Sequence, residues 1–264
     1  MGKKVLAGFM AVFALISFVS PSIASETGIR RQLNYGSPSS FAEFHGFMDL
    51  LYFDFEGNND DNGQRTIDMH NFYLSAKSSI RENIFIYGEI EYEHGGDEIK
   101  FEQGYIDWEV NPEVNLKIGQ FFTPFGIDKT NSVLPPLNKL ASKPQVIDQL
   151  VYGDWPDAGV AIYGYEDIQS LYLSYDLAII KGPAGLLKSG LQNRENNQNN
   201  MFVGRLIFNP LYNNDYIMDI GLSYADGKYD NASTNDLTLY GLYARFITDD
   251  LDLRGEYMKR RGDD

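Results

Sequence analysis

Five carboxylates stand at alternate positions of two neighbouring segments, a spacing that could support chemistry. They are Glu89, Glu91 and Glu93 in the first segment and Asp107 and Glu109 in the second. Acids that share one face of two paired strands can seat a general acid and a general base, or coordinate a divalent cation. The same spacing also produces the wet face of a strand. We favour the wet face, because none of these acids is embedded in an apolar segment.

Metal-binding patterns are incomplete. The segment that resembles the opening of a calcium loop contains Asn58, Asp60, Asn62 and Gly63. Met69 stands at the twelfth position, where such a loop needs a bidentate acid. The histidines are His45, His70 and His94, and the chain has no cysteine, whereas zinc takes three or four ligands. We therefore expect no metal and no cofactor.

Enzyme motifs are also missing from the sequence. It has no phosphate-cradling glycine loop, no nucleophile elbow and no Ser, His, Asp set in a recognisable context. We therefore expect that the protein is not an enzyme.

The elements that must position these residues are short segments in which apolar and polar residues alternate. From Phe41 onward there are about eleven, each close to the roughly 9 to 11 residues of an outer-membrane strand. The clearest is 84–92, which places Ile84, Ile86, Ile90 and Tyr92 on one face and Phe85, Tyr87, Glu89 and Glu91 on the other. The alternation is less regular in the first two segments, around 44–55 and 68–78. One apolar and one polar face per strand predicts an all-β protein, a transmembrane antiparallel β-barrel with a wet interior.

The connections between these strands alternate in length. The short ones include SSIREN, NPEV and TDD, and the longer ones between them include GNNDDNGQ, HGGDE and DGKYDNASTN. Short turns at one end and longer loops at the other are typical of an outer-membrane barrel.

The longest connection follows the fifth predicted strand and occupies residues 122–155. Its prolines include Pro124, Pro135 and Pro144, which exclude it from a sheet interior. Long connections without secondary structure tend to be functional. We expect this segment to fold inward and narrow a pore.

The N-terminus and the composition indicate export. Residues 1–24 contain Lys3 and Lys4, an apolar run and the small residues Ser22 and Ala24, as in a signal peptide cleaved after Ala24. Residues 25–40 read as a flexible lead-in, and 41–264 as the barrel domain. The formal net charge of −15 argues against nucleic acid as a partner. With no cysteine, stability must come from backbone pairing and packing.

The stretch GQFFTPFGIDKTNS, with Gly119, Pro124, Phe125 and Gly126, resembles the porin family that includes the phosphate-selective porins O and P. The later WPDAGVAIYG is also similar to that family. The resemblance covers mainly residues 104–164. It implies an outer-membrane channel in which the loop after the fifth strand sets the constriction, and it implies a homotrimer.

Two sets of residues follow for the pore. The constriction set is Pro124, Phe125, Gly126, Lys129, Lys139 and Lys143. The lumen set is Glu89, Glu91, Glu93, Asp107, Glu109, Lys117, Arg205, Arg245 and Arg254. The resemblance implies that phosphate selectivity needs a ladder of arginines, and the loop contains none. The mixture favours a field across the pore over an anion ladder, so phosphate stays open as a solute.

An odd number of strands cannot close a bacterial barrel, in which the number is even. The sequence ends on MKRRGDD, without a terminal strand ending in Phe. We therefore expect a C-terminally truncated chain, with about five strands missing from a barrel of about 16. The alternative is a complete barrel of about ten or twelve strands with misplaced boundaries.

Passive diffusion of small hydrophilic solutes or ions is the favoured function, with outer-membrane lipid around the barrel. One rival is a secreted soluble β-sandwich that binds or hydrolyses carbohydrate, which would bury the apolar faces in a core. Another is a non-conducting barrel that acts as an adhesin or assembly factor. The solute, the preferred ion and the oligomeric state do not follow from the sequence.

Overall fold

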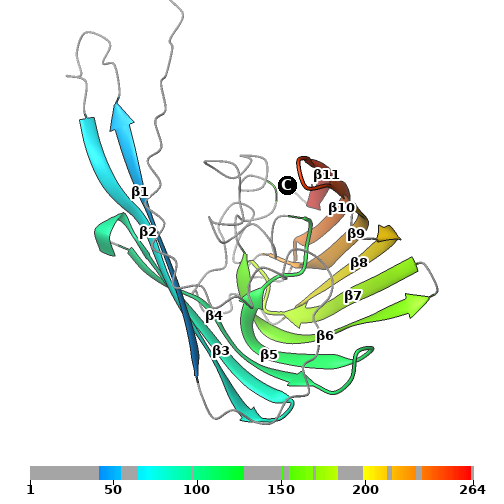
Figure 1. The fold of residues 1–264 in the computed structure, drawn as a ribbon. Coiled ribbons are helices and arrows are strands. Elements are labelled where there is room, and N and C mark those ends of the chain that lie inside the picture. Colours follow the sequence, from blue (N-terminus) through cyan, green and yellow to red (C-terminus); the bar gives the residue numbers. More distant parts are fainter. Residues whose placement is uncertain are drawn as a thin grey trace, which may run out of the picture.

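The strands form one antiparallel sheet. The computed structural model describes residues 42–54, 65–96, 98–127, 150, 155–168, 171–183, 199–212, 216–229 and 234–262. The strands are β1 (Glu43–Asp54), β2 (Arg65–Arg81), β3 (Ile84–Glu93), β4 (Glu98–Glu109), β5 (Asn115–Phe122), β6 (Pro156–Ile168), β7 (Leu171–Ile180), β8 (Met201–Tyr212), β9 (Ile217–Lys228), β10 (Asp236–Ile247) and β11 (Asp252–Gly262). A short 3-10 turn, η2 (His94–Gly96), follows β3. Each strand pairs with the next in sequence, and the sheet is strongly curved, with one concave face (Figure 1).

This architecture confirms the prediction of about eleven antiparallel strands, since the described residues form an 11-stranded sheet. They form no second sheet, so the two packed layers of a sandwich are not found in the described part of the chain. β1 and β11 are the two edges of the sheet, and they do not pair with each other. Among the described residues, no helix is long and apolar enough to cross a membrane.

The two faces of the sheet differ in chemistry, because side chains alternate along each strand. The outward face carries large apolar side chains that stay exposed, among them Ile86, Ile106, Ile118, Val160, Ile162, Leu206, Leu222 and Leu242. The concave face carries the polar residues, including Glu89, Asp107, Arg205 and Arg245, all of which are buried. An apolar surface of this size that faces outward is typical of a strand in contact with lipid.

Bulges or irregularities shift the register in four strand pairs of the described residues, namely β1–β2, β2–β3, β3–β4 and β8–β9. The register of β1 and β2 slips at Asp49 and Leu50, which leaves His70 without a Cα partner. A second slip, at Glu89 and Ile90, leaves Glu102 of β4 without one. A bulge places two residues opposite one and reverses the pattern beyond it. The bulge at His70 explains why the alternation is less regular in the second predicted strand.

Short turns close one end of the sheet. In the turn between β4 and β5, the Oδ1 of Asn111 accepts a hydrogen bond from the amide of Val114 at 2.6 Å. Between β10 and β11, the Oγ1 of Thr248 accepts one from the amide of Leu251 at 3.0 Å. Such side-chain acceptors favour tight turns. The opposite end of the sheet has the longer connections, including residues 123–155 between β5 and β6.

Candidate constriction site on the concave face

The segment that follows β5 returns next to its own starting point. β5 and β6 pair from Asn115 opposite Tyr163 to Phe122 opposite Pro156, so the first and last residues of the connection are neighbours. Beyond the last strand pair, the amide of Thr123 donates a hydrogen bond to the carbonyl oxygen of Trp155 at 3.0 Å. The connection therefore has a closed base, fixed to the sheet at both ends.

Residues 123–127, which we call the anchor turn, cross to the far strands of the sheet. The amide of Gly126 donates to Oγ of Ser223 on β9 at 3.0 Å. The amide of Ile127 donates to Oε1 of Glu256 on β11 at 3.0 Å. Nη1 of Arg205 on β8 donates to the carbonyl oxygen of Gly126 at 3.2 Å. A segment that leaves β5 and contacts these strands must lie on the concave side of the curled sheet.

The base of the connection packs on a patch of small apolar side chains on the concave face, which we call the apolar floor. Inward positions of four successive strands carry small residues, namely Ala161, Ala178, Val203 and Ala225, all buried. Phe125 and Trp155 pack in the same cluster, with exposed fractions of 1% and 0%. Burying a side chain of this size stabilises by about 1.5–3 kcal/mol, so this contact is a strong term in favour of the inward position. Short side chains on these strands leave room for the two rings.

A second apolar contact lies beside the first. Ile127 packs with Ile207 of β8 and Tyr243 of β10. A Cβ atom at Gly241 would lie 3.3 Å from the ring of Phe125, so the absence of a side chain there lets the ring approach the strand. Glycine in a strand often marks such a close approach.

The inward arginines are paired with carboxylates. Arg205, which is 7% exposed, donates from Nε and Nη2 to Oδ2 of Asp176 at 3.2 and 2.8 Å. Arg245 donates from Nε and Nη2 to the two oxygens of Asp252 at 3.0 and 2.9 Å. Arg254 donates to the same carboxylate at 3.1 and 2.8 Å. Charge-assisted pairs of this kind fix the direction of the guanidinium groups.

The acids on β3 and β4 form a separate group with aromatic neighbours. The hydroxyl of Tyr87 donates to Glu89 at 2.5 Å, and the hydroxyl of Tyr163 donates to Asp107 at 2.5 Å. Glu93 pairs with Lys100 at 2.5 Å. Glu89, Glu91 and Asp107 are buried, whereas Glu93 and Glu109 are half-buried.

Lys117 lies among aromatic rings between the acids and the apolar floor. Its ammonium group is 4.4 Å from the centre of the Tyr105 ring and 5.3 Å from that of Tyr163. A cation over an aromatic face is attracted by the ring quadrupole. Lys117 is also the direct cross-strand partner of Asp107.

The predicted site residues fall into three groups. Pro124, Phe125 and Gly126 lie in the anchor turn, and Arg205 contacts it. The predicted lumen residues on β3, β4, β5, β10 and β11 lie on the concave face but not in the turn. Lys129, Lys139 and Lys143 lie outside the described residues, as do the signal peptide, the lead-in and the calcium-like segment.

Several contributors were missed by sequence reasoning. The small residues of the apolar floor were not singled out, although their one signal is visible: inward positions that should be polar carry Ala or Val. Ser223 and Glu256 read as ordinary polar-face residues, because nothing local marks them as partners of the anchor turn.

The histidines form pairs and not a metal centre in the described part of the chain. Nδ1 of His70 is 3.0 Å from Asp49, and Nδ1 of His94 is 2.8 Å from Asp68. No group of three or more possible ligands comes together among the described residues.

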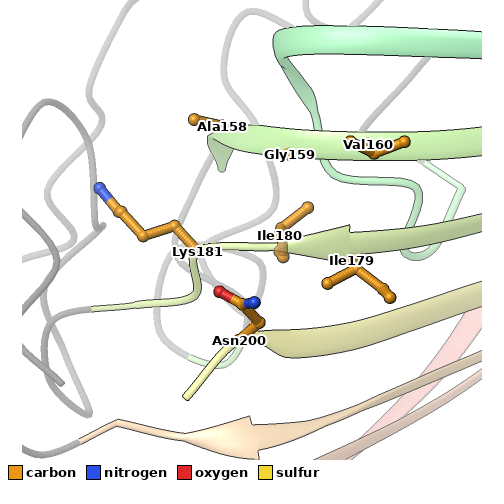
Figure 2. A pocket seen from close by; sticks show the side chains of 7 residues that line it. All are labelled: Ala158, Gly159, Val160, Ile179, Ile180, Lys181 and Asn200. Carbon is orange, nitrogen blue, oxygen red and sulfur yellow. The ribbon is translucent and has the colours of Figure 1, made fainter. Parts of the chain in front are cut away.

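A hollow of about 330 Å³ lies at the long-loop end of β6 and β7 and the start of β8. Figure 2 shows its lining residues, of which only Lys181 and Asn200 have polar side chains. Val160 and Ile179 in this lining are exposed members of the outward face. The hollow therefore lies partly on the outward face of the sheet.

Strands with one apolar outward face, together with a connection packed on the concave face, are features of a porin. A family model described as phosphate-selective porin O and P matches residues 44–263. The chain belongs to this family, which is one of outer-membrane porins and not of enzymes.

One curated relative is an uncharacterized protein of Aquifex aeolicus (strain VF5), 29% identical over 180 residues. The alignment covers 62% of this chain and 40% of the relative, so the chain spans less than half the length of that relative.

Two solved structures of one outer-membrane protein match parts of this chain. OmpT of Vibrio cholerae, folded in vitro and in its trimer form, has a TM-score of 0.43 and 9% identity, covering 84% of this chain and 78% of that chain. A variant of OmpT that lacks loop L8 has a TM-score of 0.41 and 10% identity, covering 84% and 82%.

Proposed function

We propose that the chain forms the wall of a water-filled outer-membrane channel through which small hydrophilic solutes or ions diffuse. Residues 122–155 narrow this channel from the side of β6 to β11. The observation that carries the proposal is the anchor turn, which hydrogen-bonds to β8, β9 and β11 on the concave face. The apolar outward face supports a position in lipid.

We propose that the sheet belongs to a closed barrel of about 16 strands, since an open edge at β1 or β11 would leave backbone groups unpaired in lipid. The greater length of the Aquifex aeolicus relative leaves room for further strands. The family resemblance also supports a homotrimer.

The lining charges favour a field across the channel. The acids of β3 and β4 lie on one wall, and Arg205, Arg245 and Arg254 lie on the other. These arginines form ion pairs with Asp176 and Asp252. The described wall should therefore attract anions less strongly than a ladder of unpaired arginines would. Phosphate is thus a solute to test and not the expected one.

Export follows from the same proposal, through a signal peptide cleaved after Ala24. N-terminal sequencing of protein purified from outer membranes should begin at Ser25. A mature protein that retains Lys3 and Lys4 would contradict cleavage.

Planar-bilayer recording tests the function. The refolded protein should give stepwise openings with a reproducible unit conductance. A folded, membrane-inserted protein that gives none would instead support the non-conducting barrel.

A further inference from the structure

We propose that Arg205, Ser223 and Glu256 are the positioning residues that hold the anchor turn against the wall and thereby set the width of the channel. The proposal rests on the proposed function, because it explains what keeps the constriction in place. It assigns Arg205 to the loop and not to the permeating solute.

The three residues lie on three different strands. They hydrogen-bond to the two peptide groups that flank the Cα atom of Gly126. Ser223 accepts from the amide of Gly126, and Arg205 donates to the carbonyl oxygen of the same residue. Glu256 accepts from the amide that follows. Three consecutive polar groups of a backbone outside any strand are satisfied in this way, and an unpaired buried backbone group is costly.

The side chain of Arg205 is also fixed by a partner other than the turn. Two of its nitrogens bind Asp176 of β7, and its side chain is 7% exposed. A guanidinium group is planar, so fixing two nitrogens also aims the third. Nη1 is thereby directed at the carbonyl oxygen of Gly126, and little of Arg205 is left in contact with solvent.

The shape of the turn fits these partners. Gly126 has a φ of 74°, a conformation that favours glycine. The ring of Phe125 enters the apolar floor, while Ile127 packs on Ile207 and Tyr243. The turn is thus fixed by apolar contacts on both sides and by the three hydrogen bonds between them.

The strands do not depend on this anchorage. β5 and β6 pair through their own backbone from Asn115 to Phe122, and β8 to β11 pair with one another. Loss of the anchoring side chains should therefore release the connection and leave the sheet intact. A purely structural role would instead weaken the sheet and leave the open-channel properties unchanged.

The experiment compares variants of the full chain that differ in the side-chain acceptors of the anchor turn. The double variant Ser223→Ala with Glu256→Leu removes both side-chain acceptors. The conservative pair Ser223→Thr with Glu256→Gln keeps a hydroxyl and a carbonyl oxygen at the same places. Ser174→Ala, on the concave face of β7, makes the same atomic change away from the turn. Far-UV circular dichroism and migration of unheated samples on gels confirm folding.

Two readouts are taken. One is the unit conductance in a planar bilayer, with its open-channel noise. The other is the rate of trypsin cleavage after Lys129 or Lys139, since Pro144 blocks cleavage after Lys143. We expect the double variant to conduct more, with more noise, and to be cleaved about tenfold faster, since loss of a buried hydrogen bond shifts a local equilibrium by roughly that factor. The conservative pair and Ser174→Ala should resemble the wild type.

Unchanged conductance and cleavage in a folded double variant would overturn the proposal. So would equal effects in the conservative pair, because the acceptors would then be irrelevant. A wild-type protein without conductance would contradict the proposed function alone. The cleavage rates would still report on the anchor turn in that case, so the two failures are distinguishable.

Discussion

A Cβ atom placed on Gly126 would lie 2.5 Å from Oε1 of Glu256, on a strand that follows more than a hundred residues later. Real Cβ atoms do not approach an oxygen so closely, so any other residue must displace the carboxylate or the turn. The same carboxylate accepts the hydrogen bond from the amide of Ile127. Position 126 therefore favours glycine for two separate reasons. One is its positive φ, and the other is the close approach of Glu256 on β11.

We expect Gly126→Ala to shift the anchor turn and raise the unit conductance. Gly95→Ala is the matched control, because Gly95 has a similar φ of 72° but open space around its Cβ position. Both variants introduce backbone strain of about 1 kcal/mol. Only Gly126→Ala adds a steric clash with the carboxylate of Glu256. Bilayer recordings of both variants measure the difference. Equal conductance in the two would show that the clash has no effect on the channel.

Asp252 joins two guanidinium groups, and its loss should destabilise the sheet edge. Asp252→Asn leaves Arg245 and Arg254 without their carboxylate, and Arg245 is only 7% exposed. Breaking a buried pair costs about 3–5 kcal/mol, and we expect the lower part of that range at this partly open end. Asp250→Asn, in the exposed turn just before β11, should cost little. Urea unfolding in detergent compares the two, and equal midpoints would contradict the network.

Ion preference should follow the acids of β3. We expect the wild type to pass cations more readily than anions. Glu89→Gln combined with Glu91→Gln should lower that preference, because rings and rows of charge set pore selectivity. Glu113→Gln, at an exposed position of the short turn after β4, is the control. Reversal potentials in a potassium chloride gradient measure the ratio, and a wild-type preference for chloride or phosphate would contradict this assignment.

Lipid contact of the outward face can be tested by charge. Ile162→Arg places a cation in the middle of β6, on the outward face and opposite Leu116. A charge at the midplane of a bilayer costs about 2–4 kcal/mol, and near the interface about 0–1. Ile80→Arg, next to the short turn that ends β2, should therefore be tolerated. Folding yields into lipid vesicles measure both, and equal yields would mean that this face does not lie in lipid.

Much of the fold could be predicted because side-chain alternation is a local property. The faces of 84–92 agree with β3, and the position of the long connection after the fifth strand agrees with the structure. Bulges were not predictable, since one extra residue at His70 or Glu102 looks like noise in a short segment. Each depends on the register with a neighbouring strand.

The site was less accessible to sequence reasoning. Prolines and the resemblance singled out the connection and the residues Pro124, Phe125 and Gly126. Its partners Ser223 and Glu256 lie 97 and 129 residues away from the groups they bind, and only the curl of the sheet brings them together. Arg205 could be placed on the inward face, but its burial beneath the turn depends on the same long-range packing.

The most direct measurement is the unit conductance of the wild type beside that of a variant in which residues 128–149 are replaced by a short glycine and serine linker. Both proteins should form stepwise channels, with a clearly larger conductance in the variant, because the narrowing segment has been removed and the anchor turn and β6 remain. Equal conductance in the two would show that residues 122–155 do not narrow the passage. Absence of channels in both, from folded and inserted protein, would contradict the porin function itself.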